Sequence, residues 1–341
     1  MNLYTRRLLC LTAVCGSVAA RGQEIPFKQF TATPLLLNPA FTGMFDGNIR
    51  ANLIYRNFWA AANVPISSIH GSADAPVYTD KKGNYFGAGG AFSETKPGDD
   101  SWSVLNGQVS ASYHRRFGSD SARKKGKGSD LAIGIQGGYA QNGVDVSRMY
   151  FTGASTTPTY VLGAGNSVSI YSVNAGVSYS RSVNKHFGYQ VGLSVTDLNR
   201  SQDALLESQK SLVGLNRKLM VTAGCHIAAG EHLQLRPAFI YARRESFGRN
   251  KPYVSYIAGN EFLYTLGVQT ALFCGLWYSR GDMMTINAGI RTRGVRVGVG
   301  YDYTVSSFNT ASNGTGGFEV ALTYINPSAR AVRRYVPCAR F

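Results

Sequence analysis

The segment Val295-Arg296-Val297-Gly298-Val299-Gly300-Tyr301-Asp302-Tyr303 decides the fold of this chain. Its apolar side chains stand at every second position, and small or charged residues fill the positions between them. Successive side chains of a β-strand point to opposite faces, so a period of two predicts a strand with one apolar and one polar face. This segment therefore indicates β-structure with two different environments on its two sides.

The same alternation recurs along most of the chain, for example in 131–135, 171–179, 189–195 and 318–324. It predicts fourteen antiparallel strands and an all-β fold. The predicted strands are 48–59, 67–75, 84–93, 105–117, 130–141, 167–183, 187–197, 218–228, 232–244, 262–270, 273–280, 283–292, 294–304 and 317–326.

The residues on the two faces distinguish a membrane barrel from a soluble sandwich. The polar face holds Gly, Ser, Thr, Gln and Asn with few Lys or Glu, which suits a narrow lumen. The apolar face holds bulky aliphatic residues with aromatic residues toward the strand ends, as in a lipid-facing wall with aromatic girdles. Strands that cross a bilayer need about 9–11 residues, whereas strands of soluble proteins are nearer to 5–6. Both criteria favour a single transmembrane β-barrel.

The composition of the 341-residue chain agrees with this interpretation. Only 16% of the residues are charged and 12% are aromatic, compared with about 25% charged residues in an average soluble domain. Lys and Arg (35) outnumber Asp and Glu (19), which gives a net charge of +16. Such a charge raises the possibility of nucleic-acid binding, but a barrel exported to the outer membrane meets no nucleic acid there, and we exclude that class.

The beginning of the chain predicts export. Arg6 and Arg7 precede an apolar run from Leu8 to Ala20, and small residues follow before Gln23. This is the pattern of a secretory signal peptide, and the run is too short for a transmembrane helix. We divide the chain into a signal peptide (1–22), a periplasmic segment leading into the first strand (23–47), the barrel (48–326) and a basic periplasmic tail (327–341).

An even number of strands places both termini in the periplasm, and the predicted connections then alternate between long external loops and short periplasmic turns. One periplasmic connection, 118–129, is an exception because it is long. It carries Arg123, Lys124, Lys125 and Lys127. These cations are either a docking site for an acidic partner or simply a solvated, flexible loop, and we prefer the second interpretation.

The chain has no motif for catalysis, metal binding or cofactor binding. The five histidines form no HExxH pattern, and there is no G-x-S-x-G or phosphate-binding loop. The glycines recur inside strands, where small residues suit a barrel wall. We therefore expect no catalytic, cofactor-binding or metal-binding residues, and no enzyme activity.

Several motifs in order resemble one family. These are Gln29-Phe30-Thr31-Ala32-Thr33-Pro34-Leu35-Leu36-Leu37-Asn38-Pro39-Ala40-Phe41-Thr42-Gly43, Tyr55-Arg56-Asn57-Phe58-Trp59, Gly275-Leu276-Trp277-Tyr278-Ser279-Arg280, Gly300-Tyr301-Asp302-Tyr303 and Cys338-Ala339-Arg340-Phe341. Together they resemble the PorP/SprF family, outer-membrane proteins of the type IX secretion and gliding system of Bacteroidetes. The resemblance covers residues 23–341 and implies that the motif residues Asn38, Pro39, Gly43, Tyr55, Arg56, Asn57, Asp302, Glu319 and Cys338 are mainly structural.

The residues of these motifs also predict local structure. Asn38, Pro39 and Gly43 are turn residues, and Leu35 to Leu37 suit a short plug or a cap under the barrel. If Tyr55 faces lipid, Arg56 points inward and needs a carboxylate partner. Asp302 and Glu319 stand on the polar faces of the last two predicted strands, and closure of the barrel places Glu319 beside Arg56. We therefore predict a pair between Arg56 and Glu319 across the seam.

The resemblance implies a non-enzymatic role in type IX secretion. The chain would tether periplasmic components of the machinery, or anchor or assist a secreted adhesin at the cell surface. The alternative from the residues is an outer-membrane pore or transporter for small solutes. The polar faces carry few of the charge rings that line porins, and this favours a crowded or plugged lumen over a pore.

Overall fold

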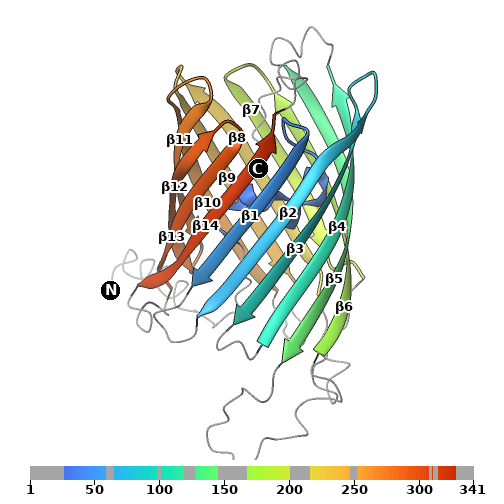
Figure 1. Cartoon of the computed structure of the whole chain (residues 1–341), viewed down its shortest axis with the longest axis vertical. Coiled ribbons are helices and arrows are strands. Elements are labelled where there is room, and N and C mark those ends of the chain that lie inside the picture. Colours follow the sequence, from blue (N-terminus) through green and yellow to red (C-terminus); the bar gives the residue numbers. More distant parts are fainter. Residues whose placement is uncertain are drawn as a thin grey trace, which may run out of the picture.

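The computed structural model describes residues 27–58, 65–97, 102–118, 127–144, 167–199, 216–245, 252–306, 309 and 314–327. Within these residues fourteen antiparallel strands form one closed barrel, in which β14 pairs with β1 (Figure 1). The strands are β1 (Ile49–Phe58), β2 (Ile66–Thr79), β3 (Tyr85–Pro97), β4 (Trp102–Phe117), β5 (Gly128–Val144), β6 (Ser167–Ser182), β7 (Phe187–Thr196), β8 (Lys218–Ala229), β9 (Leu233–Arg244), β10 (Tyr253–Thr265), β11 (Thr270–Ser279), β12 (Met283–Thr292), β13 (Val295–Thr304) and β14 (Thr315–Asn326).

The burial pattern is the reverse of that in a soluble protein. On β13, Val299 and Tyr301 are 56% and 51% exposed, whereas Asp302 between Tyr301 and Tyr303 is fully buried. The other strands repeat this pattern, with apolar side chains outside and Ser, Thr, Asn, Gln and charged residues inside. An apolar exterior around a polar interior is the arrangement of a barrel whose surroundings are lipid, and it confirms the predicted fold class.

Two strand boundaries differ substantially from the prediction. The sequence predicts strands at 262–270 and 273–280, but β10 begins at Tyr253 and ends at Thr265, and β11 begins at Thr270. The alternation of Phe262 and Tyr264 continues through Leu266 and Val268, which belong to the turn. Glu261 just before Phe262, by contrast, belongs to the strand, where it is buried and faces the lumen. Some other strands, such as β5, are longer than predicted.

The two ends of the barrel differ in their connections. One end has the short turns 80–84, 183–186, 230–232, 266–269 and 293–294, together with the connection 118–127. The opposite end has the long connections 145–166 and 197–217. We call the first the short-turn end. Because an even-stranded outer-membrane barrel keeps its termini and short turns in the periplasm, we expect the short-turn end to be the periplasmic one.

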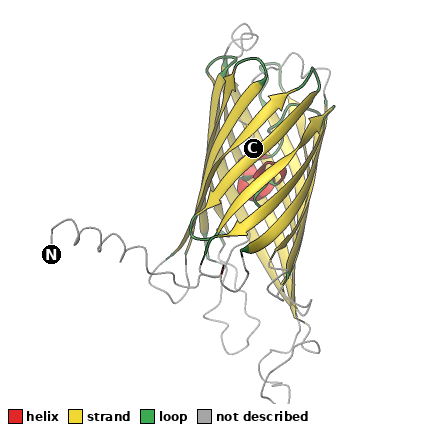
Figure 2. Ribbon diagram, turned by 90° about the vertical axis from the view of Figure 1, so that its left-hand side faces the viewer, coloured by secondary structure: helices red, strands yellow, loops and turns green. Residues whose placement is uncertain are grey.

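Residues 27–47 lie inside the barrel, and we call them the plug. The plug contains three short helices, η1 (Phe30–Ala32), α2 (Pro34–Leu37) and η2 (Pro39–Phe41), which Figure 2 shows within the ring of strands. Almost every plug side chain is buried, including Phe30, Leu35 and Phe41. The sequence predicts a periplasmic segment at 23–47, with Leu35 to Leu37 as a short plug or a cap under the barrel, and the described part of this segment lies in the lumen as a plug. None of the helices in the described residues is long and apolar enough to cross a membrane.

Candidate functional site

The plug is fixed to the barrel wall through its Asn-Pro turn. The Asn38 side chain accepts a hydrogen bond from the backbone N–H of Ala40 (2.9 Å), the self-bonding expected of an Asn turn residue. Its Nδ2 donates to the carbonyl oxygens of Val177 (3.0 Å) and Leu193 (3.3 Å) on β6 and β7. Pro39 begins helix η2 directly after this turn. One side chain therefore holds both the shape of the turn and its position on the wall.

Two inward-facing glycines allow the plug to approach the wall. A Cβ atom on Gly134 of β5 would collide with the backbone of Pro39 and Ala40, and one on Gly176 of β6 would collide with the Asn38 side chain. Glycine in a strand often marks a site where another backbone comes close. These glycines, which the sequence assigns to the barrel wall in general, thus form the seat of the plug.

A second attachment is a buried ion pair near the end of the plug. Arg50 of β1 donates two hydrogen bonds to Asp74 of β2, from Nε (2.9 Å) and Nη2 (2.8 Å). Asp74 also accepts the backbone N–H of Gly43 (2.7 Å), and Arg50 donates to the Phe41 carbonyl oxygen (3.1 Å). Gly43 has φ of +71°, a left-handed conformation that glycine adopts without strain. The pair therefore links the wall to the plug at two backbone positions.

Thr42 of the plug makes a third attachment, to β4. Its carbonyl oxygen contacts the Ser112 hydroxyl (2.7 Å) and the Nε2 atom of His114 (2.9 Å). The other ring nitrogen of His114, Nδ1, lies 3.1 Å from Asp130 of β5. The His114 ring stacks on Tyr85 at 4.1 Å. His114 is thus a satisfied lumen histidine that supports the plug.

The seam between the first and last strands holds the predicted pair. Arg56 is opposite Glu319 in the β1–β14 register, and its Nε lies 3.4 Å from Glu319 Oε1. Its Nη2 donates to Asp302 of β13 at 2.6 Å. We call Arg56, Asp302 and Glu319 the seam cluster. All three side chains are 1% exposed, so each charge depends on the others for compensation.

The seam cluster also holds the beginning of the described plug. Glu319 accepts the backbone N–H groups of Lys28 (2.7 Å) and Gln29 (2.9 Å). The Lys28 ammonium donates to Ser279 (2.6 Å) and lies 3.7 Å from Asp282 in the turn before β12. Burial lowers the pKa of Lys28, and the nearby Arg56 lowers it further. Burial likewise raises the pKa of Asp282, against the opposing effect of Lys28.

A basic pocket lies at the short-turn end, next to the plug. Its volume is about 680 Å³. It is lined by Thr31, Phe45 and Asp46 from the plug and by residues of the turns 183–186, 266–269 and 293–294 and their adjoining strands. Six cationic side chains line it, against Asp46 as the acidic one: Arg50, Lys185, Arg236, Arg291, Arg293 and Arg296. We call it the mouth pocket.

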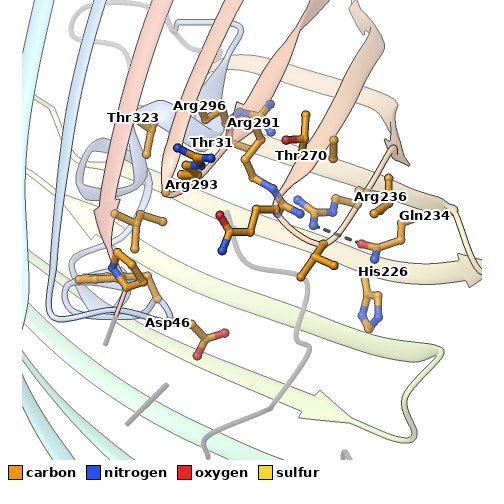
Figure 3. A pocket seen from close by; sticks show the side chains of 18 of the residues that line it. Thr31, Asp46, His226, Gln234, Arg236, Thr270, Arg291, Arg293, Arg296 and Thr323 are labelled. Atoms are coloured by element: carbon orange, nitrogen blue, oxygen red, sulfur yellow. Dashed lines mark hydrogen bonds between the residues drawn. The ribbon is translucent and has the colours of Figure 1, made fainter. Parts of the chain in front are cut away.

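Two of these arginines share one buried carboxylate. Glu261 of β10 is 2% exposed and accepts two hydrogen bonds from Arg296, at 3.2 and 2.7 Å. Arg236 lies 3.8 Å from the same carboxylate. Arg291 is directly opposite Arg296 in the β12–β13 register. Figure 3 shows these arginines gathered on one side of the mouth pocket and Asp46 away from them.

The arrangement favours an anion. Like charges directly opposite each other on neighbouring strands destabilise a sheet. Arg296 lies over the Phe273 ring, 3.5 Å from the ring centroid, and this contact directs it toward Glu261. Among the described residues no carboxylate lies within ion-pair distance of Arg291, Arg293 or Lys185. The described residues contain no group of three His, Cys, Asp or Glu side chains that could hold a metal ion.

The sequence matches the family model described as "Type IX secretion system membrane protein PorP/SprF" over residues 19–324. The chain belongs to the PorP/SprF family. This family assignment and the barrel fold make it an outer-membrane protein of the type IX secretion system, as the motifs predicted. No curated protein matches the chain.

Solved outer-membrane barrels resemble this PorP/SprF chain in overall shape. The CymD monoaromatic hydrocarbon channel is 8% identical, with a TM-score of 0.48 over 86% of this chain and 91% of that one. The toluene transporter TodX of P. putida is 10% identical, with a TM-score of 0.47 over 85% and 92%. The translocator domain of the autotransporter NalP from Neisseria meningitidis is 9% identical, with a TM-score of 0.36 over 94% and 97%.

The family motif residues separate into different environments. Asn38, Pro39 and Gly43 lie in the plug, and Arg56, Asp302 and Glu319 form the seam cluster. Tyr55 faces outward and packs near Phe318, with ring centroids 5.9 Å apart, and the Asn57 side chain donates to the Tyr55 hydroxyl (3.4 Å). Lys127 is exposed at the short-turn end. Some residues lie outside the described part of the chain: Arg123, Lys124, Lys125, Cys338 and the predicted signal peptide.

The mouth pocket was not predicted from the sequence. Arg291, Arg293 and Arg296 are close together in the sequence, but Arg50, Lys185 and Arg236 are far from them, and no local pattern joins these cations into one site. A signal was nevertheless present, because Arg236, Arg291 and Arg296 all stand near strand ends that parity assigns to the short-turn end. Glu261 was missed for another reason. It was assigned to a loop and not to an inward position of β10.

Proposed function

We propose that this PorP/SprF protein is a plugged, non-enzymatic docking barrel that tethers periplasmic components of the type IX machinery to the outer membrane. The observation that carries the proposal is the plug itself. It occupies the lumen and is attached to β1, β2, β4, β6, β7 and β14 through buried hydrogen bonds. A lumen filled in this way favours binding at the barrel ends over conduction through the middle.

The basic mouth pocket supports the periplasmic side as the docking side. Its surplus of arginines faces the short-turn end, where the exposed Lys127 also lies. Charge complementarity steers association and selects partners. The docking interpretation of Arg123, Lys124, Lys125 and Lys127, which the sequence alone did not favour, thereby gains support from a separate set of cations at the same end.

Anchoring of a secreted adhesin is the second candidate. A smaller cavity of about 260 Å³ lies on the other side of the plug, toward the long connections. It is lined by polar residues such as Asp197, Lys218 and Arg244 beside the apolar residues Leu37 and Met220. A partner at the cell surface would meet this cavity first.

Planar-bilayer recordings of the full chain test the plug. We expect no large, steady conductance from the wild-type protein, and we expect a variant lacking residues 27–47 to conduct. A steady, ion-selective current through the wild-type barrel would overturn the docking proposal in favour of a pore or transporter.

Site-specific photocrosslinking in cells tests the side of docking. A photoreactive residue at position 127 should capture a periplasmic component of the secretion machinery. The matched position is 218, where Lys218 lines the opposite cavity. Capture of a secreted surface protein from position 218, with none from position 127, would replace tethering with adhesin anchoring.

A further inference from the structure

We infer that the mouth pocket is a binding site for an acidic segment of a partner protein, with at least two carboxylates and apolar side chains between them. The inference rests on the proposed docking function and specifies the chemistry of the partner. Its residues are Arg236, Arg291, Arg293, Arg296 and Lys185, together with the apolar turn residue Val268.

The carboxylates of the described residues do not neutralise all the cationic side chains that line the mouth pocket. Glu261 is already bound by both hydrogen bonds of Arg296, with Arg236 nearby. Arg50 is bound to Asp74. Arg291, Arg293 and Lys185 have no carboxylate within ion-pair distance among the described residues. Three cations therefore remain for a ligand in one cavity.

The contact between Arg296 and Glu261 shows how an arginine of this pocket binds a carboxylate. Arginine presents a planar fork that matches the two oxygens of a carboxylate. In the pocket, Arg296 holds Glu261 in this paired manner, with both Nη atoms on the two carboxylate oxygens. Arg291 lies directly opposite Arg296 in the register. A second carboxylate entering the pocket would find the same kind of donor on the neighbouring strand.

The size and lining favour a peptide segment over a small anion. A volume of about 680 Å³ lies within the range of about 300–1,000 Å³ typical of ligand pockets. Besides the arginines, the lining contains the apolar residues Phe45, Ala271, Ile325 and Pro327. At the rim, Val268 is fully exposed in the turn 266–269. An apolar residue in that position gives a side chain of the partner a surface to cover.

The position inside the barrel rules against a lipid headgroup. The lining side chains of Arg236, Arg291 and Arg296 come from the lumen faces of β9, β12 and β13, whereas lipid contacts the opposite faces. The pocket opens to the periplasm and not to the bilayer surface. A protein segment can reach it from the aqueous phase.

Fluorescence anisotropy on the full-length protein in neutral detergent tests the inference. The probe is a short labelled peptide of alternating Glu and Val, and the matched control peptide has Gln in place of Glu. We expect the Glu peptide to bind at least about tenfold more tightly than the Gln peptide, because charge-assisted hydrogen bonds are the stronger ones. Equal affinity of the two peptides would overturn the inference.

A pair of matched variants tests the site. Arg291→Gln/Arg293→Gln removes two charges from the pocket, and Lys81→Gln/Lys82→Gln removes two charges from the turn 80–84 at the same end, outside the pocket lining. The first should weaken binding at least about tenfold and the second less than about twofold. Equal losses would reduce the effect to general charge attraction and overturn the site.

Further measurements cover a variant that does not fold, a small anion as the ligand, and a barrel that conducts ions. If Arg291→Gln/Arg293→Gln does not fold, Lys185→Gln/Arg293→Gln replaces it, because both residues lie in turns. Displacement of the peptide by inorganic phosphate at equal concentration would show that the pocket binds a small anion, and it would overturn the inference that the ligand is an acidic peptide segment. A barrel that conducts ions yet binds the Glu peptide would refute the proposed function and leave this inference intact.

Discussion

At the scale of single residues, the charges inside this barrel depend on one another because water is excluded from them. Arg56 is 1% exposed and neutralises two carboxylates, Asp302 and Glu319. Its sequence neighbours Tyr55 and Asn57 face outward. The alternation of the strand was enough to predict that Arg56 points inward and pairs with Glu319. Asp302 was also a candidate partner from the polar face of its strand, but its direct contact with Arg56 became evident only in the structure.

Arg56→Met should destabilise the barrel by about 3–5 kcal/mol, because it leaves two buried carboxylates without their partner. The unfolding midpoint in urea, followed by tryptophan fluorescence in micelles, measures the change. Lys96→Met is the control, since Lys96 forms an exposed pair with Glu94 at 3.3 Å, and exposed pairs contribute only about 0.2–1 kcal/mol. Equal losses in the two variants would contradict a structural role of the seam cluster.

Gly134→Ala should displace the plug, because the added Cβ collides with the backbone of Pro39 and Ala40. Overpacking of this kind costs about 1–3 kcal/mol. Gly137→Ala is the matched control on the same strand, because a Cβ there has nothing within 4 Å. Urea midpoints and bilayer conductance of both variants measure the outcome. A Gly134→Ala protein as stable and as closed as the control would contradict the role of Gly134 in the contact between the plug and the wall.

Asp282→Asn should change how stability depends on pH. Burial raises the pKa of the Asp282 carboxyl above its ordinary value of 3.8. A raised pKa in the folded state gives a stability contribution that is present below the ordinary pKa and is lost as the pH rises through the folded-state value. The Asn variant lacks this loss, so its stability relative to the wild type should increase with pH. Urea midpoints from acid to neutral pH check this, and parallel curves would contradict it.

At the scale of the elements, the alternation of apolar and polar residues predicts where the strands are, but it does not predict where they begin and end. The existence of all fourteen strands was predictable, because inward and outward residues differ so clearly. The ends of β10 and β11 were not, since Leu266 and Val268 continue the apolar alternation through a turn. Glu261 resembled a loop residue until its lumen partners Arg296 and Arg236 were known. A polar interior thus makes an inward strand segment look like a connection.

The pairing of β1 with β14 can be tested by a crosslink. Leu53 and Leu322 are opposite each other in the register. Cα atoms of opposite residues lie about 4.5–5.5 Å apart, within the range that a disulfide needs. In a background without native cysteines, Leu53→Cys/Leu322→Cys should therefore crosslink on oxidation, as a mobility shift on a non-reducing gel. Leu53→Cys/Val320→Cys, displaced by two residues, should not, and crosslinking of this second pair alone would correct the register.

At the scale of the whole molecule, the plug and the mouth pocket are separate devices in one barrel. The plug is held by the seam cluster, the Arg50–Asp74 pair and the glycine seat. The mouth pocket depends on arginines of β9, β12 and β13 and on the turns between strands. The plug could be suspected from the motif 29–43, but its place in the lumen required the closed sheet. The pocket required the register of strands that are far apart in the sequence, such as β1, β9, β12 and β13, which no local pattern specifies.

Because the plug and the mouth pocket depend on different residues, a change in the pocket should leave the plug in place. Arg291→Gln/Arg293→Gln should fold, keep its free energy of unfolding within about 0.5 kcal/mol of the wild type because neither arginine has a carboxylate partner among the described residues, and stay closed in a bilayer. In a strain lacking the chromosomal copy it should nevertheless not restore type IX secretion, whereas Lys81→Gln/Lys82→Gln should. Full restoration by the pocket variant would separate the pocket from the function of the barrel.

The contact of Glu319 with the backbone of Lys28 and Gln29 joins the two ends of the described chain. Residue 319 lies in the last strand to be synthesised, and residues 28 and 29 precede the first. A chain that stops before β14 therefore cannot complete this contact, however well its other strands pair. The plug is therefore fully attached only after β14 has been synthesised and the barrel has closed.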